Sequence, residues 1–593
     1  MDKVLERSKV DDKFKWSIND LFKNDDEWQA AYNKAENSLT EIEKYKNNLS
    51  IENLYECLNK RDEIMLLAEQ VCVYAGLRAN EDSTNTFYQA MDSKSERLIT
   101  ILGSAFSFIE PAILNMDEAD LKSKFDDELK LYKHYIEDIL RSRAHILSAD
   151  KEELLAQVYE IGAAPSNIFY MLNNADIQFD DVTDSKGEKH SLTHGTFVTY
   201  LESSDRELRK SAFNSLYDAY YRQKNTLAAI YSASVKKDVF NAKARNYNSA
   251  LEAALSANNI PVEVYKKLVE TVNKYLPLMH RYIKLRKKVL KLNDLDMYDI
   301  YTPIVEDINT HKTYEEAKKT VIEALKPMGK EYCQKLESAL NNEKWVDIYE
   351  NKGKRSGAYS WGAYGCHPFV SLNYNDTVDS MFTLAHEMGH AMHSHYTWSN
   401  QPFIYGDYTI FVAEVASTVN EALLMEHLLK NTDDVNEKKY LLNYFMEQFR
   451  GTLFRQTMFA EFELVTHNKV EKGEPLTFDN LCEIYLGLNK KYYGDEINSA
   501  NEKISFEWSR IPHFYTAFYV YQYATGYSAA ITLSQKILKE NGSENYIDFL
   551  KGGSSKYSID LLKGAGVDMT KPEPVENAMK VFENILDEFE KLL

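Results

Sequence analysis

The sequence predicts a mainly α-helical protein, and three observations support that fold class. Only 12 prolines and 22 glycines occur in 593 residues, so helices can run for many turns without interruption. Apolar residues recur at helical spacing over most of the chain, whereas strand-like alternation is confined to short stretches. The chain length is typical of about two to four core units.

The N-terminal part, up to about residue 175, is expected to be an array of helices. Residues 51–76 illustrate its pattern, in which apolar side chains recur on one helix face between charged ones. Residues 176–192 differ, because short alternating stretches there flank a glycine-containing turn at residues 184–188. A short β-hairpin is expected in this region.

Helices are expected to resume near Thr196 and to continue to about Lys344. The segment from Ser356 to Tyr374 contains three glycines and a proline, and it ends in strand-like alternation. A small strand or hairpin is expected there. Helix-rich sequence then continues to Leu593, without internal repeats or a long flexible linker.

The charge and cysteine content exclude several classes of partner and location. The formal net charge of -21 would repel phosphate backbones and anionic lipids, so neither a nucleic acid nor a membrane partner is expected. The five cysteines are scattered and include no CxxC pair, which argues against a disulfide framework and a cysteine-built zinc knuckle. The first residues are charged throughout, so no signal peptide is expected, and a cytoplasmic location is predicted.

Residues 511–535 form one segment that is long enough to span a bilayer and contains no Asp, Glu, Lys or Arg. It also contains His513, two glutamines and several tyrosines, which lipid would accommodate poorly. A buried helix with a polar, hydroxyl-bearing face is therefore expected, a description that suits the wall of an active site.

Residues 376–393 carry the pattern of a metal site, His386-Glu387-Met-Gly-His390. Histidines four positions apart share one helix face, and zinc accepts such nitrogen ligands at about 2.0–2.1 Å. Glu387 lies beside the first histidine, where it can take a proton from a metal-bound water. This pattern arises by chance only roughly 0.03 times in a chain of this composition. The alternative is a solvated histidine pair, but the apolar flanks indicate burial, which would be costly without a metal.

The third metal ligand is expected to come from a second helix. His393 lies seven residues after His386, about 10.5 Å further along the helix axis, so both rings cannot easily reach one ion. Residues 411–421 are largely apolar and carry two carboxylates on one face, Glu414 and Glu421. Glu414 is the predicted ligand of a single zinc ion, and Glu421 is expected to orient one histidine. The alternative is a pair of salt-bridged glutamates, and cobalt or manganese could replace zinc.

The chain resembles the thimet oligopeptidase and neurolysin family of zinc metallopeptidases, and more closely its oligoendopeptidase F branch. The motif Glu414-Val-Ala-Ser begins 24 residues after His390, as in that family. The similarity spans nearly the whole chain. Its other matching stretches are Trp16-Ser-Ile-Asn-Asp-Leu-Phe, Leu201-Glu-Ser-Ser-Asp-Arg, Lys237-Asp-Val-Phe, Tyr247-Asn-Ser-Ala-Leu-Glu and Gly357-Ala-Tyr-Ser-Trp-Gly.

The resemblance implies a mainly α, two-lobed helical metallopeptidase with a deep central channel and a small β-sheet beside the zinc helix. It implies an N-terminal helical domain over residues 1–195 and a catalytic peptidase domain over residues 196–593. The glycine-rich residues 357–374 would offer a strand edge against which the substrate backbone lies. The narrow channel would admit short unfolded peptides and exclude folded proteins.

The resemblance also assigns roles to individual residues. It makes His386, His390 and Glu414 the zinc ligands and Glu387 the general base.

The family further places a histidine and tyrosines near the scissile carbonyl, and the stretch from Arg510 to Tyr521 occupies that place in this chain. His513 and Tyr521 are the predicted donors to the oxyanion, with Tyr519 as the next choice. The spacing between the histidine and the tyrosines differs from that of the animal enzymes. Packing alone is the alternative for either tyrosine, since the chain has 41 of them.

The predicted function is that of a cytoplasmic zinc-dependent oligoendopeptidase. It would hydrolyse internal bonds of short unstructured peptides, with a metal-activated water and Glu387 as the base. Oligopeptides are the expected partners, and the oligomeric state stays open. A carboxypeptidase is a remaining alternative, whereas an aminopeptidase would need an amine-binding motif that is not found. A non-catalytic peptide-binding scaffold is a second alternative, but it would have no need of Glu387.

Overall fold

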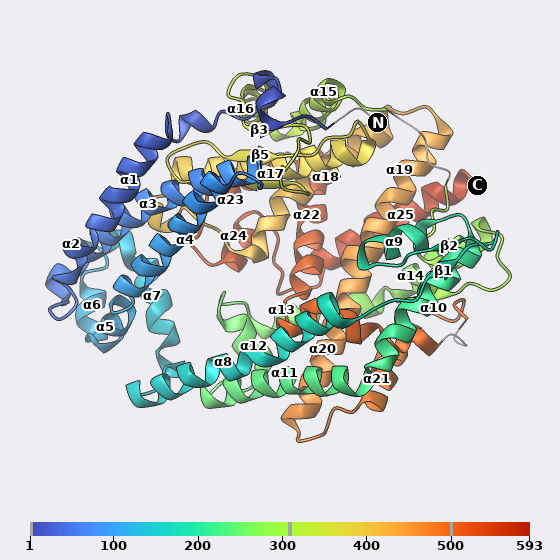
Figure 1. Cartoon of the computed structure of the whole chain (residues 1–593), viewed down its shortest axis with the longest axis horizontal. Coiled ribbons are helices and arrows are strands. Elements are labelled where there is room, and N and C mark those ends of the chain that lie inside the picture. Colours follow the sequence, from blue (N-terminus) through green and yellow to red (C-terminus); the bar gives the residue numbers. More distant parts are fainter. Residues whose placement is uncertain (1–3, 306–310, 499–501) are drawn as a thin grey trace. The chain divides into compact units, whose positions relative to one another are not determined.

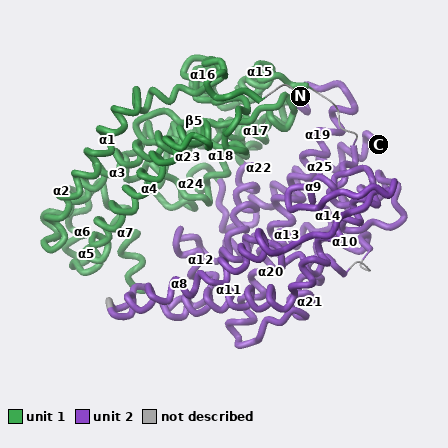
Figure 2. Tube along the Cα trace, viewed as in Figure 1, with its two compact units in different colours: residues 1–144, 310–427, 533–566 green, residues 145–309, 428–532, 567–593 purple. Residues whose placement is uncertain are grey.

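The computed structural model describes residues 4–305, 311–498 and 502–593 (Figure 1). Helices make up 71% of the structure, which confirms the predicted mainly α fold class. The chain divides into two compact units (Figure 2). Unit 1 consists of Met1–Ala144, Thr310–His427 and Leu533–Gly566, and unit 2 of His145–Asn309, Leu428–Thr532 and Val567–Leu593. The predicted domain boundary at residue 195 divides the chain differently and stays a prediction, as do the two lobes and the channel.

Unit 1 is built from helices around one small sheet. Its N-terminal elements are η1 (Arg7–Lys9), η2 (Asp12–Phe14), η3 (Ile18–Asp20), α1 (Asp25–Asn37), α2 (Leu39–Glu43), α3 (Ile51–Glu81), α4 (Thr86–Phe106), α5 (Ile109–Asn115), α6 (Glu118–Ser123), η4 (Lys130–Tyr132), α7 (Lys133–Ser142) and η5 (Arg143–His145). The later elements are α15 (Tyr314–Ala324), η8 (Lys326–Met328), α16 (Lys330–Asn341), β3 (Val346–Asp347), β4 (Tyr359–Trp361), β5 (Phe369–Ser371), α17 (Val378–Asn400), η9 (Phe403–Tyr405), α18 (Ile410–Asn431), α23 (Ser543–Leu550) and α24 (Ser558–Gly564).

Unit 2 is helical apart from one hairpin. Its first elements are α8 (Ala149–Met171), the π-helical turn η6 (Leu172–Asp176), β1 (Val182–Thr183), β2 (Lys189–His190), α9 (His194–Glu202), α10 (Arg206–Arg222), α11 (Lys224–Ala244), α12 (Ala250–Ser256), α13 (Val262–Lys274), α14 (Leu276–Val289) and η7 (Met297–Asp299). The others are α19 (Val435–Gln448), the π-helical turn η10 (Phe449–Phe454), α20 (Arg455–Glu471), α21 (Phe478–Tyr493), η11 (Glu502–Arg510), η12 (Pro512–Tyr515), α22 (Tyr521–Glu540) and α25 (Glu573–Lys591). From Leu533 onward, α22 belongs to unit 1.

Both predicted strand regions are confirmed. β1 and β2 pair as an antiparallel hairpin whose turn contains Gly187 at a φ of 84°, a conformation that glycine adopts without strain. β4 and β5 pair antiparallel, and β3, which the sequence did not predict, adds to β5 in parallel. The resulting strand order is β3-β5-β4, so β4 lies at an edge of this sheet. The sheet packs against α17, as expected for the helix of the metal motif.

α3 and α4 form a long antiparallel pair in unit 1, and Leu98 and Leu102 of α4 are buried in its core. The stretch Thr86–Asn115 is long and apolar enough to cross a membrane, judged by length and composition alone. Core helices of soluble proteins pass the same test. The absence of a membrane partner therefore stays a prediction.

The prediction of a single helix over residues 511–535 is wrong for residues 511–520. Residues 512–515 form a 3-10 turn, Phe518 has a φ of 56°, and the helix α22 begins only at Tyr521. A left-handed residue ends helical geometry because the backbone can no longer form the regular hydrogen bonds. From Tyr521 onward the expectation of burial and of a hydroxyl-bearing face is confirmed. The buried hydroxyl-bearing residues of this part are Tyr521, Thr525, Tyr527, Ser528, Thr532 and Ser534.

Candidate active site

α17 presents the predicted metal-binding residues of unit 1. The helix begins after Thr377, whose side chain accepts a hydrogen bond from the backbone N–H of Ser380 and so satisfies one free donor of the first turn. His386, Glu387 and His390 follow two to three turns later, among buried apolar side chains of the same helix. The local sequence thus determines both the helix and the face that carries the two histidines.

α18 lies against α17 because glycine allows close contact between the two backbones. A Cβ atom at Gly389 would lie 2.6 Å from Cα of Ser417 and 2.7 Å from the carbonyl oxygen of Ala416, distances that real side chains do not occupy. The buried Asn420 donates a hydrogen bond of 3.0 Å from Nδ2 to the carbonyl of Ala385. These contacts bring Glu414 of α18 to the histidine face of α17.

Three potential ligand atoms converge at this face. Nε2 of His386 and Nε2 of His390 are 3.2 Å apart, and Oε2 of Glu414 lies 3.4 Å from the first and 3.7 Å from the second. Four ligands placed tetrahedrally at about 2.0–2.1 Å from zinc would be separated by about 3.3 Å. The donor set and its spacing therefore fit a zinc ion. The structure brings the three predicted ligands together, while their occupation by a metal stays a prediction.

Neighbouring groups hold both histidine rings. Nδ1 of His386 donates a hydrogen bond to Oε1 of Glu421, and His390 is hydrogen-bonded to the backbone of Ala413. Burial lowers the pKa of His386, but the hydrogen bond and charge of Glu421 outweigh that effect and raise it to about 9. Burial and the neighbouring charge of His386 lower the pKa of His390. The arrangement leaves both Nε2 atoms facing the same point, with Glu421 in the orienting position predicted for it.

Glu387, the residue after His386 on α17, is only 7% exposed. Burial raises the pKa of its carboxyl group. The charge of His386 opposes this effect, the negative charges of Glu414 and Glu421 support it, and the resulting pKa is about 7. The backbone of Ser360 in β4 is hydrogen-bonded to the carboxyl, which ties Glu387 to the edge strand. A carboxyl group with such a pKa can exchange protons near neutral pH.

His393 does not take part in this convergence. The side chain is 1% exposed and its ring stacks on Tyr408 at a centroid distance of 3.7 Å. Burial lowers the pKa of His393 to about 3, so the ring is neutral at ordinary pH. His393 thus packs α17 against the neighbouring rings of Tyr408 and Phe549.

The predicted oxyanion donors belong to unit 2, whereas the metal-binding residues belong to unit 1, and each group is described separately. The rings of His513 and Tyr519 lie 6.0 Å apart, and the ring of Tyr523 contacts both, at 6.0 Å and 5.6 Å. Tyr521 is 3% exposed and its ring packs against Tyr265 at 5.1 Å.

Sequence reasoning missed Tyr523 as a member of this group. The available signal was its position four residues after Tyr519, which would place both rings on one face if a helix began there. The roles of His513, Tyr519 and Tyr521 stay predictions.

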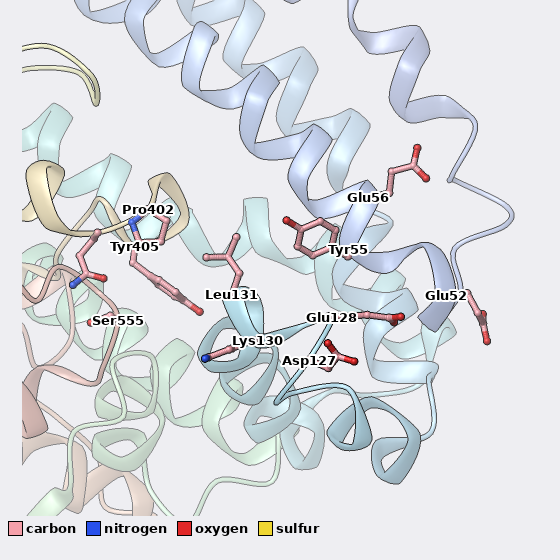
Figure 3. A pocket seen from close by; sticks show the side chains of 11 residues that line it. Glu52, Tyr55, Glu56, Asp127, Glu128, Lys130, Leu131, Pro402, Tyr405 and Ser555 are labelled. Atoms are coloured by element: carbon pink, nitrogen blue, oxygen red, sulfur yellow. The ribbon is translucent and has the colours of Figure 1, made fainter.

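A separate cavity of about 800 Å³ lies elsewhere in unit 1 (Figure 3). In the figure its carboxylates gather near the start of α3, and Pro402, Tyr405 and Ser555 lie on the opposite side. Its carboxylate side chains are Glu52, Glu56, Asp127 and Glu128. None of the predicted site residues lines this cavity, so it is distinct from the metal-binding face.

The fold and the site together define a metallopeptidase, since two histidines and a glutamate converge beside a buried glutamate on a mainly helical scaffold. Residues 199–581 match the family described as Peptidase family M3, and residues 113–179 match Oligopeptidase F. The chain therefore belongs to peptidase family M3, within its oligoendopeptidase F group.

Individual relatives agree with this assignment. The chain is 50% identical to the oligopeptidase PepF of Bacillus subtilis, over 99% of this chain and 88% of that protein. It is 42% identical to the group B oligopeptidase PepB of Streptococcus agalactiae, over 99% and 98% of the two chains. The crystal structure of oligoendopeptidase-F from Enterococcus faecium matches with a TM-score of 0.74 and 40% identity, over 96% and 99% of the chains. A putative peptidase from Chlamydophila abortus matches with a TM-score of 0.93 and 35% identity over both whole chains.

Proposed function

We propose that this metalloendopeptidase is zinc-dependent and cleaves internal bonds of short unstructured peptides in the cytoplasm, with Glu387 as the general base. The observation that carries the proposal is the convergence of His386, His390 and Glu414 beside a buried carboxyl group. Their spacing suits a tetrahedral ion, and Glu387 directly follows the first of the two histidines on the same helix.

His386, His390 and Glu414 would hold the ion, and Glu421 would keep the His386 ring in position. A bound zinc ion polarises a peptide carbonyl and lowers the pKa of a coordinated water toward ~7. Glu421 accepts the Nδ1 proton of His386, so the proton that a metal would displace is the one on Nε2. This division of roles explains why α18 carries two carboxylates on one face.

Glu387 would accept a proton from the attacking water and then deliver it to the amine of the leaving peptide. Its pKa of about 7 suits both directions of transfer near neutral pH, because neither form is strongly disfavoured. Burial also keeps bulk water away from the carboxyl group, which favours transfer to the reacting atoms.

β4 would align the substrate. It lies at an edge of its sheet in the described part of the chain, and an extended peptide can add to such an edge as a further strand. The backbone of Ser360 in β4 touches the carboxyl of Glu387. A peptide that pairs with β4 would therefore run close to the proposed base.

His513 and a tyrosine would donate hydrogen bonds to the developing oxyanion, a contribution that is typically worth ~10²–10³ in turnover for each donor. Both Tyr521 and Tyr519 are candidates. The contact between the rings of His513 and Tyr519 favours Tyr519, because Tyr521 is buried against Tyr265.

The test is cleavage of an internally quenched peptide that is blocked at both termini. An endopeptidase is expected to cut it, to lose activity when a chelator removes the metal, and to recover activity when zinc is added back. A carboxypeptidase would leave the blocked peptide intact, and activity that survives complete metal removal would contradict the proposed zinc dependence.

A further inference from the structure

Unit 2 contains a fully buried carboxyl group to which the proposed mechanism assigns no role. Glu463 of α20 is 0% exposed, and its Oε1 accepts a hydrogen bond of 2.8 Å from the backbone N–H of Phe518. Its Oε2 is also buried and has no hydrogen-bond partner among the described residues, which form no ion pair with Glu463 either. Such a group is costly unless its position is needed.

The partner of Glu463 is the backbone at an unusual turn. Phe518 has a φ of 56°, which is unfavourable for a residue with a bulky side chain and persists only where its surroundings hold it. Its ring is buried between those of Tyr265 and His467, at 5.6 Å and 4.4 Å. The turn sends the side chain of Phe518 into the core, while the next residue, Tyr519, lies beside His513.

Charge considerations show in which form Glu463 acts. Burial raises the pKa of Glu463 well above the usual carboxyl range, and the charge of Asp238 adds to this against the hydrogen bond from Phe518. This shift favours the neutral, protonated form of the carboxyl group. A neutral acid can still accept the N–H of Phe518 through its carbonyl oxygen Oε1.

We infer that Glu463 is a positioning residue for the oxyanion-binding segment: by accepting the Phe518 N–H it fixes the turn that sets Tyr519 beside His513. The inference rests on the proposed function of that segment. Glu463 acts through the backbone, and its side chain does not contact substrate. Loss of the acceptor would release the strained turn and displace Tyr519 from His513.

The test compares three variants of the zinc-loaded enzyme on the blocked quenched peptide. E463M keeps the volume but removes the acceptor, and kcat is expected to fall ~10–100-fold with KM and zinc content unchanged, because displaced catalytic groups lose about that much. E463Q keeps an acceptor oxygen and neutrality, and its kcat is expected to stay close to that of the parent enzyme. The matched control is E471M on the same helix, since Glu471 likewise accepts a backbone N–H, that of Ala250 at 2.7 Å.

The kcat of E471M is expected to equal that of the parent enzyme, even if its unfolding temperature is lower. An unchanged kcat in E463M would overturn the inference. If E463M does not fold, the inference is tested with E463Q instead. A large loss of kcat in folded E463Q would show that an acceptor oxygen at this position is not sufficient. A retained kcat would support the inference.

A double-mutant cycle separates this inference from the proposed function. If Glu463 acts through Tyr519, adding E463M to Y519F is expected to lower kcat little further. If the losses of kcat from the two substitutions are additive, Glu463 does not act through Tyr519. If H513A and Y519F both leave kcat unchanged, the proposed role of the segment fails. If they lower kcat and E463M does not, only the inference about Glu463 fails.

Discussion

Glu421 accepts the Nδ1 proton of His386 across the contact between α18 and α17. This hydrogen bond connects the two helices at the metal-binding face, and it decides which ring nitrogen of His386 is available to an ion. A carboxylate in that position fixes the ring orientation and increases the basicity of the metal-binding nitrogen.

Loss of this carboxylate is expected to weaken metal binding. In E421Q the zinc affinity should fall about 10–100-fold, because the histidine loses both its orientation and its charged partner. Competition with a chelator of known affinity measures the change. The matched control is E426Q on the same helix, where Glu426 accepts a hydrogen bond from Gln535 instead. Equal zinc affinity in E421Q and the parent protein would show that the His386 ring is held by packing alone.

The pH dependence of zinc binding follows from the same contact. Burial lowers the pKa of His386, but Glu421 overcomes this effect and raises the pKa to about 9 in the metal-free protein. At pH 7.5 the ring therefore carries a proton that zinc must displace, so zinc affinity is expected to rise with pH until about 9. In E421Q the pKa should fall, and affinity should level off at lower pH.

Calorimetric titration of the metal-free protein in two buffers of different ionisation enthalpy measures the protons released. About one proton should leave His386 per zinc bound at pH 7.5, and fewer should leave in E421Q. The absence of proton release in the parent protein would contradict the raised pKa of His386.

Glu387 is expected to be essential for turnover and dispensable for metal content. In E387Q kcat should fall about 10²–10⁴-fold, since the amide cannot accept the proton of the attacking water. Zinc content should stay at the level of the parent protein, measured by elemental analysis. E426Q serves as the control and should keep both properties. An E387Q protein with high kcat would assign the base to another group.

The close approach at Gly389 makes a further prediction. G389A should lower stability by about 1–3 kcal/mol, because the added methyl group would overlap Ser417 and force α18 away. Zinc affinity should fall as well, since Glu414 would move with α18. The control is G103A in α4, where a Cβ atom meets nothing within 4 Å.

G103A should be neutral or stabilising by up to about 1 kcal/mol, as for other exposed helical glycines. Thermal unfolding and chelator competition measure both variants. Normal stability and zinc affinity in G389A would show that the contact between α17 and α18 tolerates a larger separation.

Local sequence was sufficient for some of these features and not for others. The two histidines share a face because they lie four positions apart on one helix, and this follows from helix geometry alone. The place of Glu414 depends on how α18 packs against α17, and only its occurrence on an apolar face indicated a partner. The strand β3 could not be predicted, because two residues are too few to show alternation.

The residue at which α22 begins also could not be predicted from the local sequence. An uncharged segment is consistent with a continuous helix from Ile511, yet Phe518 adopts a left-handed conformation. That turn is held by Glu463 from a helix some 55 residues away in the chain, a contact that no short pattern reveals. As a result, the spacing of Tyr519 and Tyr521 could not predict which neighbours their side chains contact: Tyr519 lies beside His513, and Tyr521 packs against Tyr265.

The composition of unit 1 has a consequence for the synthesis of the protein. Its last stretch, Leu533–Gly566, supports the metal-binding helix: Thr397 of α17 donates a hydrogen bond to the carbonyl of Leu550, and Gln401 donates one to that of Lys551. A nascent chain that has emerged from the ribosome only as far as residue 532 therefore cannot yet form these hydrogen bonds. The catalytic helix acquires its final environment only when translation is nearly finished.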